Sequence, residues 1–182
     1  MNLELLQTLG KVKQYEKGEF VCMENDEGYT AYLLLSGEVD VLLKSFYDKP
    51  KVVAHLKQGT IFGEMSLLEN KPRNASVIAT TDMIKVLEIE KSNFLAILKT
   101  DKQIAYNLFQ TLLGRMEKEM DSMYRANIAY VSEFRRNKLY RQMQGIGSEQ
   151  FAIIIEKDSD YALQLLKFLS HSLAEINSQF SK

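Results

Sequence analysis

Between Gly59 and Val77 the chain reads GTIFGEMSLLENKPRNASV, and this stretch is the most informative part of the sequence. A glycine and small residues open a short helix, an acid follows at Glu64, and an arginine comes nine residues later at Arg73. The exposed amides of a helix start attract negative charge, and a guanidinium can grip two phosphate oxygens at once. A carboxylate accepts hydrogen bonds from hydroxyls and donates none to a phosphate. The segment therefore predicts a site for a small anion that also carries a sugar hydroxyl.

The order and spacing of these residues resemble the phosphate-binding cassette of the cyclic nucleotide-binding domain family. Four features carry the resemblance, namely Phe-Gly-Glu, the leucine pair, Pro-Arg and the Ala-Ser-Val start of a strand. The resemblance implies that Glu64 holds the ribose 2′-hydroxyl and that Arg73 pairs with the cyclic phosphate. The ligand-binding set that it implies is Phe62, Gly63, Glu64, Met65, Ser66, Arg73, Asn74 and Ala75.

Within this set the resemblance implies that the backbone amides of Met65, Ser66 and Asn74 complete the phosphate cradle. Leu67 falls where the family has an apolar residue that reports occupancy to a neighbouring helix. Asn74 departs from the small or hydroxyl residue common at its position, which leaves the choice between cAMP and cGMP as the ligand open. Two alternatives remain: a surface turn with a solvated acid and arginine, and a degenerate member that has lost its ligand. Both Glu64 and Arg73 are present, which favours binding over either.

The composition is that of an ordinary soluble protein, with 46% hydrophobic and 26% charged residues among 182. This length suits one compact domain plus an appendage. A formal net charge of -1 gives no general attraction to nucleic acid or to an anionic membrane. Cys22 is the only cysteine, so no internal disulfide can form, which fits a reducing compartment. No apolar run approaches a membrane span and no signal peptide is evident, so we expect a cytoplasmic protein without a membrane partner.

The first half of the chain predicts an α+β fold, a β-roll or jelly-roll barrel of about eight antiparallel strands with an N-terminal helix and C-terminal helices. A short apolar helix spans Asn2 to Leu9, and closely spaced β-rich runs separated by turn residues follow. Asn25 stands where the family often has glycine, and asparagine tolerates the left-handed conformation that the turn requires. The predicted strands are Lys11 to Tyr15, Phe20 to Met23, Thr30 to Leu35, Glu38 to Lys44, Lys51 to Leu56, Ser76 to Thr80 and Met83 to Ile89.

From Lys91 the pattern changes to helix, with a short helix from Ser92 to Leu98 and a long one, capped by Thr100 or Asp101, that reaches about Met143. We therefore expect a nucleotide-binding domain over 1–143 and a helical tail over 148–182. Residues spaced alternately by four and three form a heptad seam that favours a homodimer through the long helix. The alternative is a stripe that packs within the chain, which is preferred from Leu108 to Met116. The seam residues are Met116, Met120, Met123, Asn127, Tyr130, Phe134 and Asn137.

Asn127 has two interpretations that the sequence does not separate. It can pair with its symmetry mate in a dimer and fix the register of the two helices. It can instead contact the base of the nucleotide, because members of the family can close a helix over that base.

The tail repeats the preceding helical region at an offset of 57 residues. Phe151 to Phe180 therefore resembles the short helix, capping turn and long helix that follow a roll, although any two successive helices share some periodicity by chance. The tail is expected to pack on the first domain or across a dimer, as a remnant of a tandem domain. The matching pairs are Phe94 and Phe151, Ile97 and Ile154, Asp101 and Asp158, Ala105 and Ala162, Leu108 and Leu165, and Leu112 and Leu169.

DNA binding and catalysis are both disfavoured. The tail is too short for a framed helix-turn-helix and has few basic residues, whereas phosphate binding requires a clustered positive face. His55 and His171 have no metal-ligand spacing, and Glu64 has no accompanying metal set for phosphodiester cleavage. The sequence therefore predicts a non-enzymatic sensor that binds a cyclic nucleotide, with cAMP favoured, needs no metal or other cofactor, and signals to a downstream effector protein. The alternatives are a non-binding scaffold and, less favoured, a transcription regulator.

Overall fold

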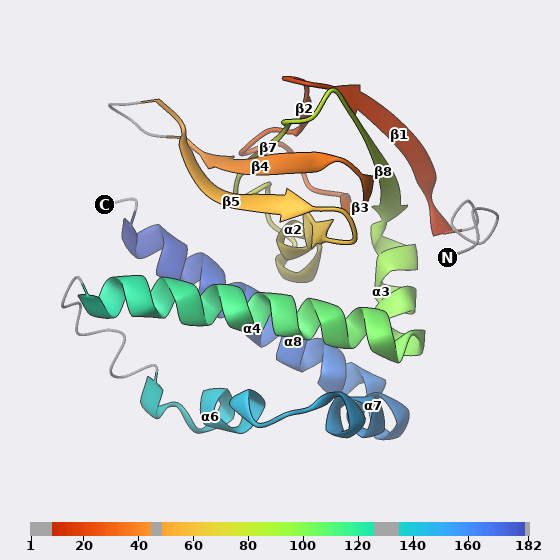
Figure 1. Ribbon diagram of the computed structural model, residues 1–182. Coiled ribbons are helices and arrows are strands. Elements are labelled where there is room, and N and C mark those ends of the chain that lie inside the picture. Colours follow the sequence, from red (N-terminus) through yellow and green to blue (C-terminus); the bar gives the residue numbers. More distant parts are fainter. Residues whose placement is uncertain (1–8, 45–48, 126–134, 181–182) are drawn as a thin grey trace. The chain divides into compact units, whose positions relative to one another are not determined.

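The computed structural model describes residues 9–44, 49–125 and 135–180, and the chain divides into two compact units, Met1–Ala96 and Ile97–Lys182 (Figure 1). The boundary lies inside the helix α3 (Lys91–Thr100), whereas the sequence places the division near Gly145. The difference arises because the helix after α3 packs against the two helices of the tail. The helix expected over Asn2 to Leu9 lies outside the described residues except for Leu9.

The first unit is a roll of two four-stranded sheets, so the predicted fold class is confirmed. One sheet has the order β1-β8-β3-β6 and the other β2-β7-β4-β5, and all paired strands are antiparallel. Each sheet joins strands that are distant in sequence, which is the pattern of a jelly roll. The strands are β1 (Lys11–Glu16), β2 (Phe20–Cys22), β3 (Thr30–Ser36), β4 (Glu38–Leu43), β5 (Lys51–Lys57), β6 (Ile61–Phe62), β7 (Ser76–Ala79) and β8 (Met83–Glu90).

The core of the roll forms because apolar side chains alternate along the strands. In β8 Ile84 and Val86 are buried, whereas Met83 and Lys85, which alternate with them, are exposed. Leu34 belongs to the same buried cluster. The two-residue strand β6 is absent from the sequence-based assignment, and it leads directly into the short helix α2 (Glu64–Glu69).

The second unit consists of helices, and its long helix is shorter than predicted. The helices after α3 are α4 (Lys102–Arg125), α6 (Lys138–Gln144), α7 (Ser148–Lys157) and α8 (Ser159–Phe180). One continuous helix to about Met143 is wrong, because Asn137 has non-helical dihedral angles and caps α6 by accepting from the amides of Leu139 and Tyr140. Asp101 caps α4 by accepting from the amide of Ile104 at 2.9 Å, as the sequence predicts.

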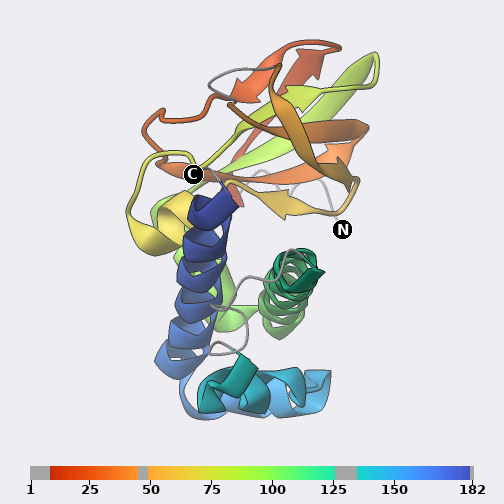
Figure 2. The same ribbon diagram turned by 90° about the vertical axis from the view of Figure 1, so that its left-hand side faces the viewer.

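The core of the helical unit is the contact between α4 and α8, which lie beside one another in both views (Figures 1 and 2). The first two seam residues, Met116 and Met120, are fully buried within the chain. The other seam residues up to Phe134 lie where the structure describes no side chains, so the homodimer stays a prediction. Helix α6 buries Tyr140 and Met143, and burial raises the pKa of Tyr140 to about 12.

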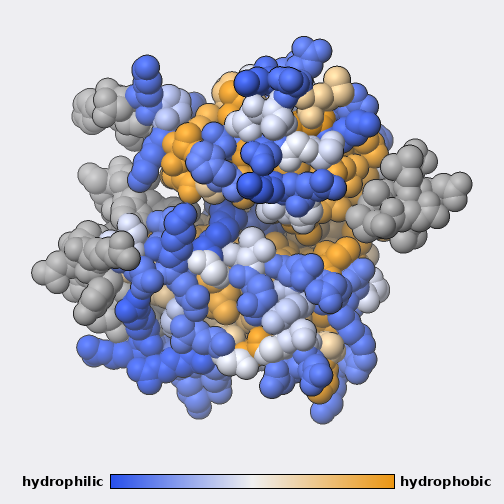
Figure 3. Space-filling model, in the orientation of Figure 1, coloured by the Kyte–Doolittle hydropathy of each residue, from blue (hydrophilic) through white to orange (hydrophobic). Residues whose placement is uncertain are grey.

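Polar side chains predominate on the face of the helical unit that Figure 3 shows, as expected when the apolar face of each helix is turned into a shared core. None of the helices in the described ranges combines the length and apolar character needed to cross a membrane.

Candidate functional site

The short helix α2 begins at a glycine that no other residue could replace without strain. Gly63 is the N-cap of α2 and has φ 72° and ψ 5°, in the left-handed region. A Cβ added to Gly63 would lie 2.7 Å from Nη1 of Arg73, so the backbone conformation and the close approach both require glycine. Helix α2 ends at Asn70, which also adopts left-handed angles. The chain then turns towards Arg73.

Arg73 places its guanidinium at the start of α2. Its Nη1 donates to the carbonyl oxygen of Gly63 at 2.8 Å and to Oγ of Ser66 at 2.8 Å. Its Nη2 donates to Oγ1 of Thr30 at 3.0 Å. The guanidinium carbon lies 5.3 Å from the ring centroid of Tyr32, within the range of a cation–π contact. Four contacts from α2 and β3 therefore hold this cation in one place.

The charge of Arg73 is buried but is not neutralised by these hydrogen bonds. The side chain is 5% exposed, and its three hydrogen-bond acceptors are a carbonyl and two hydroxyl oxygens, all neutral. A cation removed from water without an opposite charge is costly, and an anion placed against it recovers part of that cost. The structure thus presents an oriented guanidinium suited to a bound anion.

The loop between β2 and β3 fixes the backbone at the other end of Arg73. The amide of Arg73 donates to the carbonyl of Asp26 at 2.8 Å, and its carbonyl accepts from the amide of Asn25 at 2.9 Å. Asn25 has φ 73°, which confirms that asparagine adopts the left-handed conformation in this turn. A Cβ on Gly28 would lie 2.4 Å from Cβ of Ser66, so the same loop also closes directly onto α2.

Glu64, the other residue singled out from the sequence, is 2% exposed in the first turn of α2. It directly follows Gly63, whose carbonyl Arg73 contacts, so its backbone lies at the end of α2 that the arginine reaches. Ser66 donates to the Gly63 carbonyl and accepts from Arg73, so it links the arginine to the start of α2. Asn74 and Ala75 are half-buried, and Asn127 lies outside the described residues. The buried members of the predicted set are Phe62, Glu64, Met65, Ser66, Leu67 and Arg73.

The sequence did not identify Thr30, Tyr32 and Gly28 as members of the site. Thr30 and Tyr32 alternate on β3 and so share a face, but nothing local indicates that this face meets α2. This face reaches α2 because Tyr32 of β3 pairs with Phe62 of β6 in antiparallel fashion. The rings of Tyr32 and Phe62 stack with their centroids 5.2 Å apart. Because β6 was not predicted, neither was this pairing.

Comparison with known proteins bears directly on this arrangement. Residues 12–101, which contain the roll, α2 and Arg73, match the model of the cyclic nucleotide-binding domain family. This segment belongs to the cyclic nucleotide-binding domain family. The resemblance inferred from the cassette is therefore confirmed, and the fold agrees with it.

The relatives of this cyclic nucleotide-binding domain include proteins named for either nucleotide. The chain is 42% identical to a cAMP-dependent protein kinase regulatory subunit of Colletotrichum orbiculare over 46% of the chain and 20% of that protein. It is 32% identical to the human cGMP-dependent protein kinase 2 over 46% of the chain and 11% of that protein. The chain thus spans a fifth or less of the length of these relatives. A solved transcriptional regulator of Thermotoga maritima aligns with 28% identity and a TM-score of 0.50 over 57% of the chain and 81% of that protein.

The side chains that could suggest catalysis are two histidines and a cysteine. His55 is exposed on β5 and contacts Asp40 of β4 at 2.6 Å, and His171 is exposed on α8 beside Glu175. Burial raises the pKa of the Cys22 thiol, and the nearby charge of Arg73 partly opposes that rise. A thiol of raised pKa is a poor nucleophile. Within the described ranges no group of three or more His, Cys, Asp or Glu side chains could hold a metal ion.

Proposed function

We propose that this protein is a cytoplasmic sensor of cyclic nucleotides, with cAMP as the preferred ligand, that acts by regulation and not by catalysis. The observation that carries the proposal is the buried guanidinium of Arg73, which is oriented by three neutral acceptors. A cyclic phosphate carries one negative charge and offers acceptors to such a group. The greater identity to the cAMP-dependent relative than to the cGMP-dependent one supports the preference for cAMP.

In this proposal each member of the site has a separate role. Arg73 and the amides of Met65, Ser66 and Asn74 bind the phosphate, and Glu64 accepts a hydrogen bond from the ribose 2′-hydroxyl. Phe62, Gly63 and Ala75 line the same site. Binding moves Leu67, which is 2% exposed and so cannot shift without moving its neighbours. The signal then passes through the helices after Lys91 to an effector protein, to the extent that the ligand has different affinities for the two states.

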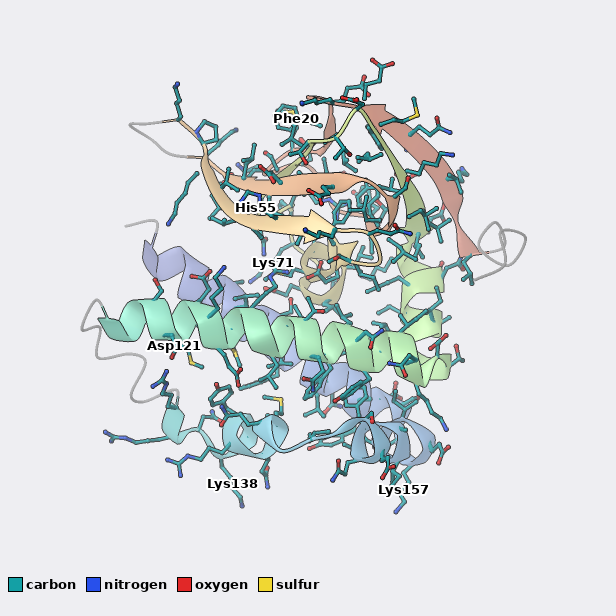
Figure 4. All side chains as sticks on the ribbon, viewed as in Figure 1. Phe20, His55, Lys71, Asp121, Lys138 and Lys157 are labelled. Carbon is teal, nitrogen blue, oxygen red and sulfur yellow. The ribbon has the colours of Figure 1, made fainter. Side chains whose placement is uncertain are left out.

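Calorimetric titration of Arg73→Leu with cAMP and cGMP tests the proposal. A hydrogen bond to a charged group contributes about 1.5–3 kcal/mol, so the affinity should fall by at least about tenfold. Lys71→Leu is the matched control, because it also removes one positive charge, two residues from Arg73 in the sequence. The Lys71 side chain is exposed and pairs with Glu69 at 3.0 Å (Lys71 is labelled in Figure 4). Circular dichroism of both variants checks that the roll is still folded. Equal affinities for the wild type and Arg73→Leu would refute the role of Arg73.

One observation favours a second candidate, a scaffold that no longer binds nucleotide. The guanidinium of Arg73 already has three acceptors from its own chain, so three of its five N–H donors are used without a ligand. A thermal-shift measurement with millimolar cAMP and cGMP separates the two functions, because a ligand at 100 times its Kd stabilises the folded state by about 2.7 kcal/mol. No shift with either nucleotide would favour the scaffold.

A further inference from the structure

The chain contains the same helix pair twice. Helix α3 ends, Asp101 follows, and α4 begins; 57 residues later α7 ends, Asp158 follows, and α8 begins. Each aspartate uses its side chain in the same way, with Asp101 accepting from the amide of Ile104 and Asp158 from the amide of Tyr161, both at 2.9 Å. The offset of 57 residues holds for both members of each hydrogen bond, so the two turns are alike in geometry as well as in sequence.

The two long helices also bury equivalent positions. At six buried positions of α4, the residue 57 places later in α8 is buried as well, so the two helices turn the same amphipathic face inward, in the same phase from their capping aspartates. One of these equivalent pairs, Leu113 and Ser170, joins an apolar side chain to a small polar one, so the shared feature is the buried face and not the identity of every residue. The pairs are Ala105 and Ala162, Leu108 and Leu165, Phe109 and Leu166, Leu112 and Leu169, Leu113 and Ser170, and Met116 and Leu173.

Two ion pairs connect the copies in a reciprocal manner. Lys99, near the end of the first short helix, bonds to Asp160 in the first turn of α8 at 2.6 Å. The equivalent of Lys99 in the second copy is Glu156, and it bonds to Lys102 in the first turn of α4. The end of each short helix therefore contacts the start of the other copy's long helix. Asp160 corresponds to Gln103, one residue beyond Lys102, so the two contacts are equivalent at the level of the helix ends, which is the pattern of an approximate twofold axis.

The charges at these positions favour the pairing of unlike copies. The first copy contributes Lys99 and Lys102, and the second contributes Glu156 and Asp160. If two first copies met in the same way, lysine would face lysine; if two second copies met, acid would face acid. Like charges across an interface oppose association, so the pattern selects the mixed pair over both uniform ones.

We propose that α7 and α8 occupy, within the same chain, the surface on α4 that a second copy of this protein would otherwise cover. The buried apolar positions of α4 are then satisfied by the chain's own tail, and the two reversed ion pairs make the tail a better partner than another molecule. This inference does not depend on nucleotide binding. It predicts that the isolated protein does not pair through α4, in contrast to the homodimer expected from the heptad seam.

Cross-linking of the full chain tests which chain supplies α8. In the background Cys22→Ser, the variants Lys102→Cys and Glu156→Cys are combined and treated with a short bismaleimide, and the Lys99–Asp160 pair is left in place. Tagged and untagged chains are mixed before the reaction. We expect a link within one chain, with no tagged–untagged product at any dilution that permits detection. A product that joins two chains would overturn the proposal, because it would show that α8 is supplied by a second copy.

Charge reversal with oligomeric state as the readout tests the selection between partners. Lys99→Glu with Lys102→Glu places acids against acids, which should lower the thermal midpoint by about 2–4 °C and weaken the hold of the tail. Adding Glu156→Lys and Asp160→Lys should restore both the midpoint and the monomer in sedimentation. The control is Lys118→Glu with Lys138→Glu, which makes the same change of charge at exposed positions of α4 and α6 (Lys138 is labelled in Figure 4). A wild-type dimer, or a fourfold variant no better than the double variant, would contradict the proposal.

Discussion

The two compact units place their charges differently. Among the described residues, both buried charged side chains, Glu64 and Arg73, belong to the roll. The helical unit buries apolar residues and two serines, Ser170 and Ser172, and keeps its ion pairs exposed at the ends of its helices. Burial of a charge lowers stability unless something compensates for it, whereas an exposed ion pair has little effect on stability.

The charges of the two units therefore serve different purposes. The roll buries the cation of Arg73 against neutral acceptors beside a single short helix, which is understandable if an anionic ligand completes the electrostatics there. The helical unit has a core that needs no ligand, and its charges select which helices meet. Substitutions that compare the two units therefore separate effects on binding from effects on assembly.

The largest expected effect on stability comes from the helical core. Leu112→Ala and Leu169→Ala each remove a fully buried side chain at equivalent positions of the two copies, and each should lower the free energy of unfolding by roughly 2–5 kcal/mol. If the copies are equivalent, the two losses should agree within the scatter of cavity effects. Urea titration followed by circular dichroism measures both. Losses that differ by more than that scatter would show that the two copies contribute unequally to the core.

The structure of the roll and that of the helical unit could be predicted from the sequence to different extents, and the reason is physical. In the roll, turn residues and alternation identified seven of the strands, and Asn25 took the expected left-handed angles. Glu64 and Arg73 were found because a glycine, an acid and an arginine at fixed spacing form a local pattern that is visible before the fold is known. Thr30 and Tyr32 were missed because they reach Arg73 through the pairing of β3 with β6, and a strand of two residues leaves no periodic signal.

In the helical unit, periodicity showed which positions are buried but not what covers them. Met116 and Met120 follow the heptad spacing whether the partner is another chain or the chain's own α8. The long helix was extended too far because Asn137 was assigned to the seam, whereas its side chain caps α6. An asparagine serves equally in either role, so only the backbone angles decide between them.

The next effect in size lies in the roll and concerns Gly63. Gly63→Ala forces an alanine into left-handed angles at a cost of about 1–2 kcal/mol and brings its Cβ within 2.7 Å of Nη1 of Arg73. Gly59→Ala is the matched control, since Gly59 has φ 88° but open space around its Cβ. We expect both variants to lose stability and only Gly63→Ala to lose nucleotide affinity, by about tenfold or more, because Arg73 is displaced. Equal affinities in calorimetry would mean that Arg73 does not act on the ligand.

The two capping aspartates give a smaller effect and a direct test of the internal repeat. Asp101→Ala and Asp158→Ala each remove the side chain that accepts from an amide in the first turn, and each should cost about 0.5–2 kcal/mol. Asn at either position should restore most of the loss, because its side-chain oxygen also accepts. The measurement is thermal unfolding of the four variants. A normal midpoint for one alanine variant alone would show that the two turns, though alike in geometry, carry unequal shares of the stability.

The smallest effect concerns Asp160, whose pKa the hydrogen bond and charge of Lys99 hold below the ordinary value of 3.8. The folded state thus binds this proton less readily than the unfolded state, so the pair stabilises the fold above pH 3.8 and this contribution is lost as the pH falls through the lowered pKa. Asp160→Asn should therefore differ from the wild type at neutral pH and converge with it in acid. Lys99→Met should remove the same pH-dependent difference, and the two substitutions together should add nothing further. A difference in unfolding free energy that stays constant from neutral pH into acid would mean that the effect of Asp160→Asn does not come from the ion pair with Lys99.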